Sequence, residues 1–188
     1  RSSLDRVSLM ELSVLMSVYS GTRVRDLTAC LNSLRAQTIL ADEIIMVIDG
    51  PLSEDTADHI EIAMSSLPIK TISFPENQGL GHALRHGLLQ CSHELVARVD
   101  TDDICLPNRF YMQINYLDTN SDIALVGGGL REWYDRRGKT SCTVRCGPLD
   151  PNSIAIHARS RNPFNHPTVL FRKSAVLASG NYQSCFMF

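Results

Sequence analysis

Residues 95–103 read Leu95-Val96-Ala97-Arg98-Val99-Asp100-Thr101-Asp102-Asp103, a short apolar run that ends in three carboxylates within four residues. Carboxylates this close repel one another, and one of them takes up a proton unless a cation lies among them. The stretch therefore predicts one of two arrangements. In the first, the acids lie on a loop in water, and their negative charge stabilises the N-terminus of a helix that begins near Pro107. In the second, they bind a positive ion.

Similar short runs occur at a regular spacing along the first two thirds of the chain. Besides 95–99 they cover residues 12–18, 43–48, 69–73 and 123–126. Each is apolar on both faces and bounded by turn residues, which is typical of buried parallel strands. Helical stripes fill the gaps, as in Leu27, Cys30, Leu31 and Leu34 at positions i, i+3, i+4 and i+7. Strand and helix in alternation predict an α/β fold with a mainly parallel central sheet.

The alternation ends after residue 126. The ranges 130–134 and 141–146 flank a polar turn and predict a hairpin, 154–158 a short helix and 168–171 a further strand. We expect one domain over residues 12–188, preceded by an N-terminal extension or tag-like segment over residues 1–11.

Composition excludes several classes of partner. The chain has 188 residues, 44% of them hydrophobic, and a formal net charge of -2, so we expect no nucleic-acid partner. No apolar run is long enough to cross a bilayer. The spacing of the six cysteines fits neither a disulfide framework nor a zinc site, which favours reduced thiols in a cytoplasmic protein.

Polar residues follow three of the predicted strands, at Ser17-Val18-Tyr19, at Asp49 and at the three acids. Ligands of open α/β sheets bind beyond the carboxyl ends of the strands, so we expect these groups to converge on one rim. Asp100 and Asp102 leave on one face if the chain stays extended, whereas Asp103 points elsewhere or begins the next turn. Oxygen ligands alone favour Mg²⁺ or Mn²⁺, with a diphosphate completing the coordination.

Residues 97–109, ARVDTDDICLPNR, resemble the DxD region of family 2 glycosyltransferases, which reads A-R-x-D-x-D-D and then P-x-R. Five further segments resemble landmarks of that family, in the family's order. They are residues 13–19 (SVLMSVY), 33–38 (SLRAQT), 42–50 (DEIIMVIDG), 76–80 (ENQGL) and 165–174 (NHPTVLFRKS).

The resemblance implies the GT-A fold, a Rossmann-like three-layer α/β/α sandwich. It implies metal-dependent transfer of a sugar, with inversion, from a nucleotide-sugar, here a UDP-sugar, to a glycan or lipid-linked acceptor in bacterial polysaccharide biosynthesis. Such a protein would work in the cytoplasm, with peripheral association at the cytoplasmic face of the inner membrane. The sugar, the linkage and the oligomeric state stay open.

The resemblance also assigns residues. Asp102 would bind Mn²⁺ or Mg²⁺ directly, with Asp100 near the metal or the ribose; Asp49 would contact the base, and His166 would lie beside the donor phosphates or the acceptor. The whole nucleotide-sugar site would comprise Ser17, Val18, Tyr19, Asp49, Asn77, Arg98, Asp100, Thr101, Asp102 and His166. The general base that takes the acceptor proton is expected beyond Phe188, in a chain truncated at its C-terminus.

Other readings stay open at this point. Gly21-Thr22-Arg23 is similar to the G-T-R motif of sugar nucleotidyltransferases, but the glycine-rich loop that precedes this motif is absent here. Asp100-Thr101-Asp102 would suit a haloacid-dehalogenase phosphatase, but in those enzymes the nucleophile ends the first core strand, and here three predicted strands come earlier. A nucleotide-sugar-binding domain without turnover is the non-enzyme alternative. Arg98 and Arg109 could equally form structural ion pairs, and Asp49 could belong to a simple turn.

Overall fold

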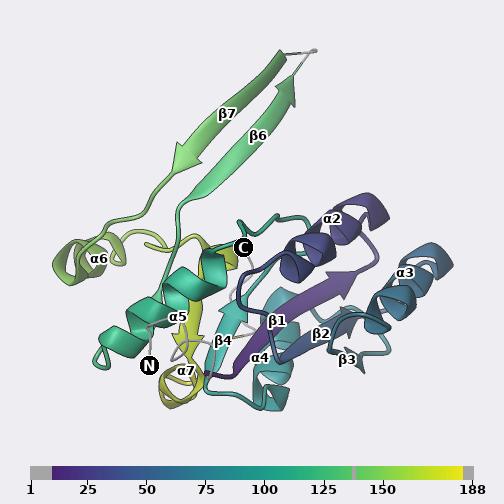
Figure 1. The fold of residues 1–188 in the computed structure, drawn as a ribbon, viewed down its shortest axis with the longest axis horizontal. Coiled ribbons are helices and arrows are strands. Elements are labelled where there is room, and N and C mark those ends of the chain that lie inside the picture. Colours follow the sequence, from purple (N-terminus) through teal and green to yellow (C-terminus); the bar gives the residue numbers. More distant parts are fainter. Residues whose placement is uncertain (1–9, 137–138, 184–188) are drawn as a thin grey trace.

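The central sheet has six strands in the order β3-β2-β1-β4-β8-β5. The computed structural model describes residues 10–136 and 139–183 (Figure 1). Four strands run parallel: β1 (Leu12–Tyr19), β2 (Glu43–Asp49), β3 (Ile69–Ser73) and β4 (Leu95–Arg98). The fifth strand, β8 (Leu170–Arg172), lies between β4 and the edge strand β5 (Leu125–Val126) and runs antiparallel to both. The predicted α/β fold with a mainly parallel sheet is confirmed.

Helices cover both faces of this sheet, because its strands are apolar on both sides. Val14 and Met16 of β1 pack with α2 (Val24–Arg35), α3 (Glu54–Met64) and α5 (Arg109–Thr119). Leu15 points the other way, toward α4 (Leu80–Gln90), and the same core reaches α7 (Lys173–Ala178). The result is the predicted three-layer sandwich, with two apolar cores separated by the sheet.

One buried carboxylate, that of Glu43, connects β1, β2 and β3 near their amino ends. Glu43, at the start of β2, accepts hydrogen bonds from Ser13 Oγ at 2.6 Å, Lys70 Nζ at 2.7 Å and Ser92 Oγ at 3.0 Å. Burial acts to raise the pKa of Glu43, but these hydrogen bonds outweigh it and lower the pKa to about 2. The ionised glutamate therefore ties three strands and the loop before β4 together.

The predicted hairpin exists as a separate two-stranded sheet of β6 (Leu130–Arg136) and β7 (Lys139–Arg145), which projects from the body (Figure 1). It leads into α6 (Pro151–His157), which starts at Asp150, whose carboxylate accepts the backbone N–H of Ser153. At the base of the hairpin, Asn165 Nδ2 donates to the carbonyls of Gly128 and Arg145.

Several predicted boundaries differ from the structure, among them the helix expected over 154–158, which is α6 and begins at Pro151. The strand expected over 168–171 begins only at Leu170, because Pro167 lies in a 3₁₀ turn, η1 (His166–Thr168), that the Thr168 hydroxyl closes on Asn165 O. The strand expected over 123–126 is reduced to β5. The expected extension over 1–11 lies mostly outside the described residues; Met10 packs against the core, and β1 begins at the predicted Leu12.

In the described part of the chain, no helix has the length and apolar character needed to cross a membrane.

Candidate functional site

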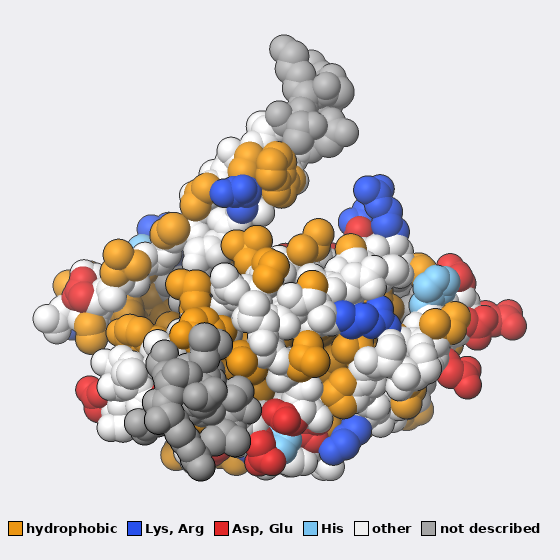
Figure 2. All heavy atoms as spheres, viewed as in Figure 1, with side chains coloured by type: hydrophobic (Ala, Val, Ile, Leu, Met, Phe, Trp, Pro, Cys, Tyr) orange, Lys and Arg blue, Asp and Glu red, His pale blue; other side chains and the backbone are white. Residues whose placement is uncertain are grey.

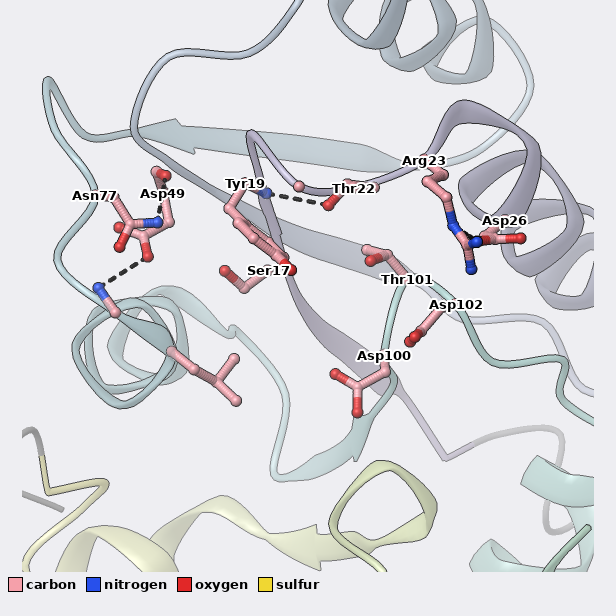
Figure 3. A pocket seen from close by; sticks show the side chains of 13 residues that line it. Ser17, Tyr19, Thr22, Arg23, Asp26, Asp49, Asn77, Asp100, Thr101 and Asp102 are labelled. Carbon is pink, nitrogen blue, oxygen red and sulfur yellow. Dashed lines mark hydrogen bonds and ion pairs between the residues drawn. The ribbon is translucent and has the colours of Figure 1, made fainter. Parts of the chain in front are cut away.

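A cavity of about 610 Å³ lies beyond the carboxyl ends of β1, β2 and β4, where the fold class places its ligands (Figure 3). It is bordered by the strand ends, by the starts of α2 and α4 and by the turn after β4. Its lining consists of Ser17, Tyr19, Gly21, Thr22, Arg23, Asp26, Asp49, Asn77, Gly79, Leu80, Asp100, Thr101 and Asp102.

One side of this cavity carries the acid cluster, which we define as Asp100, Asp102 and Asp103. One carboxylate oxygen from each lies within 4.8 Å of the others. Of the two placements expected for Asp103, the structure shows the turn, because the backbone is not extended there. It turns at Thr101 and Asp102, with Asp103 N–H donating to Asp100 O at 3.3 Å, and this returns Asp103 to its neighbours.

The electrostatics of the acid cluster are unfavourable in the protein alone. Burial, and then the charges of Asp100 and Asp102, raise the pKa of Asp103 to about 6. Three oxygen donors with unrelieved repulsion match the chemistry of a hard divalent cation, so the residues present fit Mg²⁺ or Mn²⁺.

Arg98 lies beneath the acid cluster and is completely buried, with 0% of its surface exposed. Its Nη1 forms an ion pair with Asp100 Oδ1. Its Nε and Nη2 have no hydrogen-bond partner among the described residues, which is costly for a buried cation.

Arg109 shows what a structural arginine looks like in the same neighbourhood. Its Nη2 donates to Arg98 O at 2.8 Å and to Val169 O at 3.3 Å, and its Nε donates to Gln113 Oε1 at 3.1 Å. Of the two readings left open for Arg109, the structure supports the structural one, since it joins α5 to the ends of β4 and β8.

Asp49 forms the opposite wall and is only 3% exposed. Its two carboxylate oxygens accept the backbone N–H groups of Gln78 at 2.7 Å and Gly79 at 2.9 Å, while Asn77 Nδ2 donates to Asp49 O at 3.2 Å (Figure 3). Gly79 has a φ of 89°, a left-handed conformation that favours glycine. Asp49 therefore holds the loop that starts α4 in place along the cavity.

Tyr19 and the start of α2 complete the wall. Tyr19 N–H donates to Thr22 Oγ1 at 3.2 Å, and Arg23 Nε pairs with Asp26 Oδ2 at 2.6 Å. The N-termini of α2 and α4 both border the cavity, and helix N-termini favour anions. The cavity thus offers carboxylates for a cation on one side, next to the start of α2, and the N-terminus of α4 on the opposite side, beside Asp49 and Asn77 (Figure 3).

Seven of the ten residues predicted for the site line this cavity. They are Ser17, Tyr19, Asp49, Asn77, Asp100, Thr101 and Asp102. The other three do not line it. The Val18 side chain is buried in the core on the far face of β1, because strand side chains alternate between faces.

The Arg98 side chain is fully buried, with Nη1 paired to Asp100, and neither Arg98 nor His166 belongs to the lining of this cavity. His166 lines a second cavity of about 260 Å³ and contacts Tyr182, with ring centroids 5.7 Å apart. Burial, and then the charge of Arg98, lower the pKa of His166 to about 4, so this imidazole is neutral at pH 7.

Sequence reasoning missed Thr22, Arg23 and Asp26 as lining residues. They start a helix directly after β1, and the general rule that helix N-termini meet strand ends at this rim was the available signal. Some landmark residues also prove to be structural. Gln37, for example, donates to Leu106 O at 2.8 Å and accepts the Phe110 N–H at 3.2 Å, which fixes the segment after the acid cluster.

Comparison with known proteins places this geometry in a family. The family model described as glycosyl transferase family 2 matches residues 13–172. Amylovoran biosynthesis glycosyltransferase AmsE of Erwinia amylovora is 44% identical over 171 residues, which are 91% of this chain and 63% of the relative.

A second relative is the Escherichia coli UDP-Gal:alpha-D-GlcNAc-diphosphoundecaprenol beta-1,3-galactosyltransferase, which is 32% identical over 178 residues, 95% of this chain and 64% of the relative. The chain thus spans slightly less than two thirds of the length of these relatives. Among solved structures, the mannosyltransferase PcManGT from Pyrobaculum calidifontis in complex with GDP-Man and Mn²⁺ matches with a TM-score of 0.68. That match has 14% sequence identity and covers 95% of this chain and 49% of that one, which confirms the GT-A type of fold.

Proposed function

Because this chain belongs to glycosyl transferase family 2, we propose that it binds a UDP-sugar with a divalent cation and transfers the sugar, with inversion, to a lipid-linked or other glycan acceptor. A relative's name pairs UDP-Gal with a diphosphoundecaprenol-linked acceptor, which supports both choices. The protein would work in bacterial polysaccharide assembly on the cytoplasmic side of the membrane.

The observation that carries the proposal is the acid cluster at the edge of the large cavity. Its like charges are close enough to repel, and the ion pair with Arg98 neutralises only part of them. Like charges held this close together lower the stability of the fold, so their presence favours a functional role. A site for a cation and a phosphate needs such an arrangement.

Different residues of the cavity would bind different parts of the donor. Asp100 and Asp102 would hold Mn²⁺ or Mg²⁺, and a metal there supplies Lewis-acid stabilisation of the departing diphosphate. Ser17, Tyr19 and Asn77 line the side of the cavity next to Asp49, where we place the nucleoside. Asp49 would accept from the base N–H while keeping the 76–79 loop in position. Thr101, which is only 8% exposed, keeps the turn between the two aspartates compact.

Calorimetry of UDP binding, with and without Mn²⁺, tests this proposal. In the unchanged protein we expect Mn²⁺ to strengthen UDP binding, and Asp102→Asn to abolish that gain while leaving metal-free binding as it was. Asp58→Asn, on the exposed surface of α3, is the matched control and should behave like the unchanged protein. Equal Mn²⁺ dependence in Asp102→Asn and in the unchanged protein would overturn the metal assignment.

Turnover is tested separately, by release of UDP from UDP-sugars in the presence of Mn²⁺ and a lipid-linked acceptor. Tight binding without any release under these conditions would favour the nucleotide-sugar-binding domain over the transferase.

A further inference from the structure

The β6–β7 hairpin has two chemically different faces. In its register Trp133 lies opposite Cys142 and Arg131 opposite Val144, so these four side chains share one face. On that face Trp133 is 65% exposed and Val144 62% exposed. We call these four residues the outer face of the hairpin.

The other face is internally bonded. Arg145 Nη1 donates to Glu132 Oε1 at 2.8 Å, and the Tyr134 hydroxyl donates to Glu132 Oε2. Glu132 is therefore already neutralised by bonds on this face, whereas Asp135 falls in register with Arg131 and Trp133 on the outer side of the ribbon. The exposed apolar side chains are left on the side without such bonds.

An exposed two-stranded sheet of this kind needs a partner. Such a ribbon is only marginally stable in water, and in the described part of the chain neither edge of β6 or β7 pairs with another strand. The ribbon projects from the body (Figure 1), and hydrophobic side chains lie on its surface (Figure 2). Exposed apolar side chains that share one face, as Trp133 and Val144 do, are typical of a docking surface.

The charge of the region shows which partner fits. Residues 130–161 carry seven Lys and Arg and three Asp and Glu, whereas the rest of the chain carries 11 and 17. The segment that follows the hairpin also exposes Leu149 by 93% and Ile156 by 66%. A basic, apolar projection is complementary to an anionic surface, and two such hairpins would repel each other.

We propose that the outer face of the hairpin docks on a bilayer that contains anionic lipid. Tryptophan partitions to the boundary between water and acyl chains, and arginines next to it are attracted by anionic headgroups. This inference adds a membrane contact to the proposed function: a hairpin held on the bilayer would keep the donor cavity near a lipid-linked acceptor. Vesicle binding itself requires no donor, no metal and no turnover.

The test uses Trp133, the only tryptophan of the chain, as its own probe. The full chain is mixed with phosphatidylcholine vesicles, with and without phosphatidylglycerol, and both fluorescence and co-sedimentation are measured. We expect the Trp133 emission to shift to the blue, and the protein to sediment, only with the anionic vesicles, and added salt to reverse both effects. Arg131→Gln should weaken binding about fivefold, and Trp133→Ser, followed by co-sedimentation, roughly tenfold.

Matched variants on the body serve as controls. Arg25→Gln on α2 and Ile62→Ser on α3, where Ile62 is 67% exposed, should bind vesicles like the unchanged protein. UDP binding with Mn²⁺ should be the same in all four variants, which shows that each is folded and separates a failure of docking from a failure of the donor site. Equal binding to neutral vesicles, no binding, or loss of binding in the body variants alone would overturn the proposal. So would a self-association, measured by sedimentation equilibrium without lipid, that Trp133→Ser abolishes.

Discussion

Glu43 begins β2 at one end of the central sheet, and the acid cluster follows β4 at the other end. Both regions place carboxylates beside buried strands, and both contain a cation. At the first end a single carboxylate receives Lys70 and the hydroxyls of Ser13 and Ser92, and its pKa falls to about 2. At the second end three carboxylates share Arg98, and the pKa of Asp103 rises to about 6.

The difference separates a group that stabilises the fold from groups that we propose bind a ligand. Glu43 has its partners within the chain, so its ionisation contributes to stability. Among the described residues, Nε and Nη2 of Arg98 have no hydrogen-bond partner and the carboxylates of the acid cluster repel one another, which is what a site for a cation and a phosphate would relieve. Opposite responses to removal of charge at the two ends would establish this contrast.

The largest effect is expected for Glu43→Gln. The glutamine is as neutral as the protonated acid, so the variant should lose the stabilisation that the lowered pKa represents, about 3 kcal/mol of unfolding free energy at neutral pH. Urea unfolding measures it, with Glu61→Gln on the exposed side of α3 as the control that should change little. UDP binding by the folded variant should be unchanged. A loss below roughly 1 kcal/mol would remove the contrast between the two ends, since Glu43 would then be no better satisfied than an exposed acid.

The same carboxylate predicts how stability depends on acid. The folded-state pKa of about 2 lies below the ordinary value of 4.5, so the unfolded chain binds the proton first. The contribution of Glu43 is therefore complete above about pH 4.5 and is lost as the pH falls toward 2. Unfolding free energies measured across this range should fall more steeply for the unchanged protein than for Glu43→Gln. Parallel curves would show that Glu43 titrates normally.

Much of this arrangement could be predicted from the sequence, for identifiable reasons. The apolar runs define the parallel strands, and the rule that strand ends meet at one rim brought Asp49 together with Asp100 and Asp102. Val18 was misplaced because its neighbours Ser17 and Tyr19 line the cavity, and the alternation of a strand turns Val18 away.

What the sequence left undetermined at the two ends has different origins. The role of Glu43 was missed because its partners Ser13, Lys70 and Ser92 come from distant segments, and no local pattern connects them. The placement of Asp103 stayed open because it depends on whether the backbone extends or turns at Thr101, and it turns. The hairpin was predicted, but its projection from the body depends on tertiary contacts that periodicity does not contain.

Removal of charge from the acid cluster should have the opposite effect to that at Glu43. Asp103→Asn relieves repulsion from Asp100 and Asp102, so we expect the metal-free protein to become more stable by about 1 kcal/mol in urea unfolding. Mn²⁺ should raise the unfolding temperature of the unchanged protein more than that of the variant, because the cation relieves the same repulsion. A loss of stability in the variant without metal would show that the acid cluster is a structural element like Glu43.

An effect no larger than that at Asp103 is expected at Asp49, which lies at the ligand end yet, like Glu43, has both carboxylate oxygens hydrogen-bonded within the chain. Asp49→Asn keeps one acceptor for the N–H groups of Gln78 and Gly79 and loses the other, so we expect about 1 kcal/mol less stability. If Asp49 also contacts the base, binding of UDP with Mn²⁺ should weaken while binding of pyrophosphate with Mn²⁺ stays the same, because pyrophosphate has no base. Calorimetry with the two ligands compares these directly. Equal weakening for both would mean that Asp49 contributes to the cavity only by holding the 76–79 loop. The donor cavity would then contain both a structural carboxylate, Asp49, and the carboxylates that we propose bind the metal.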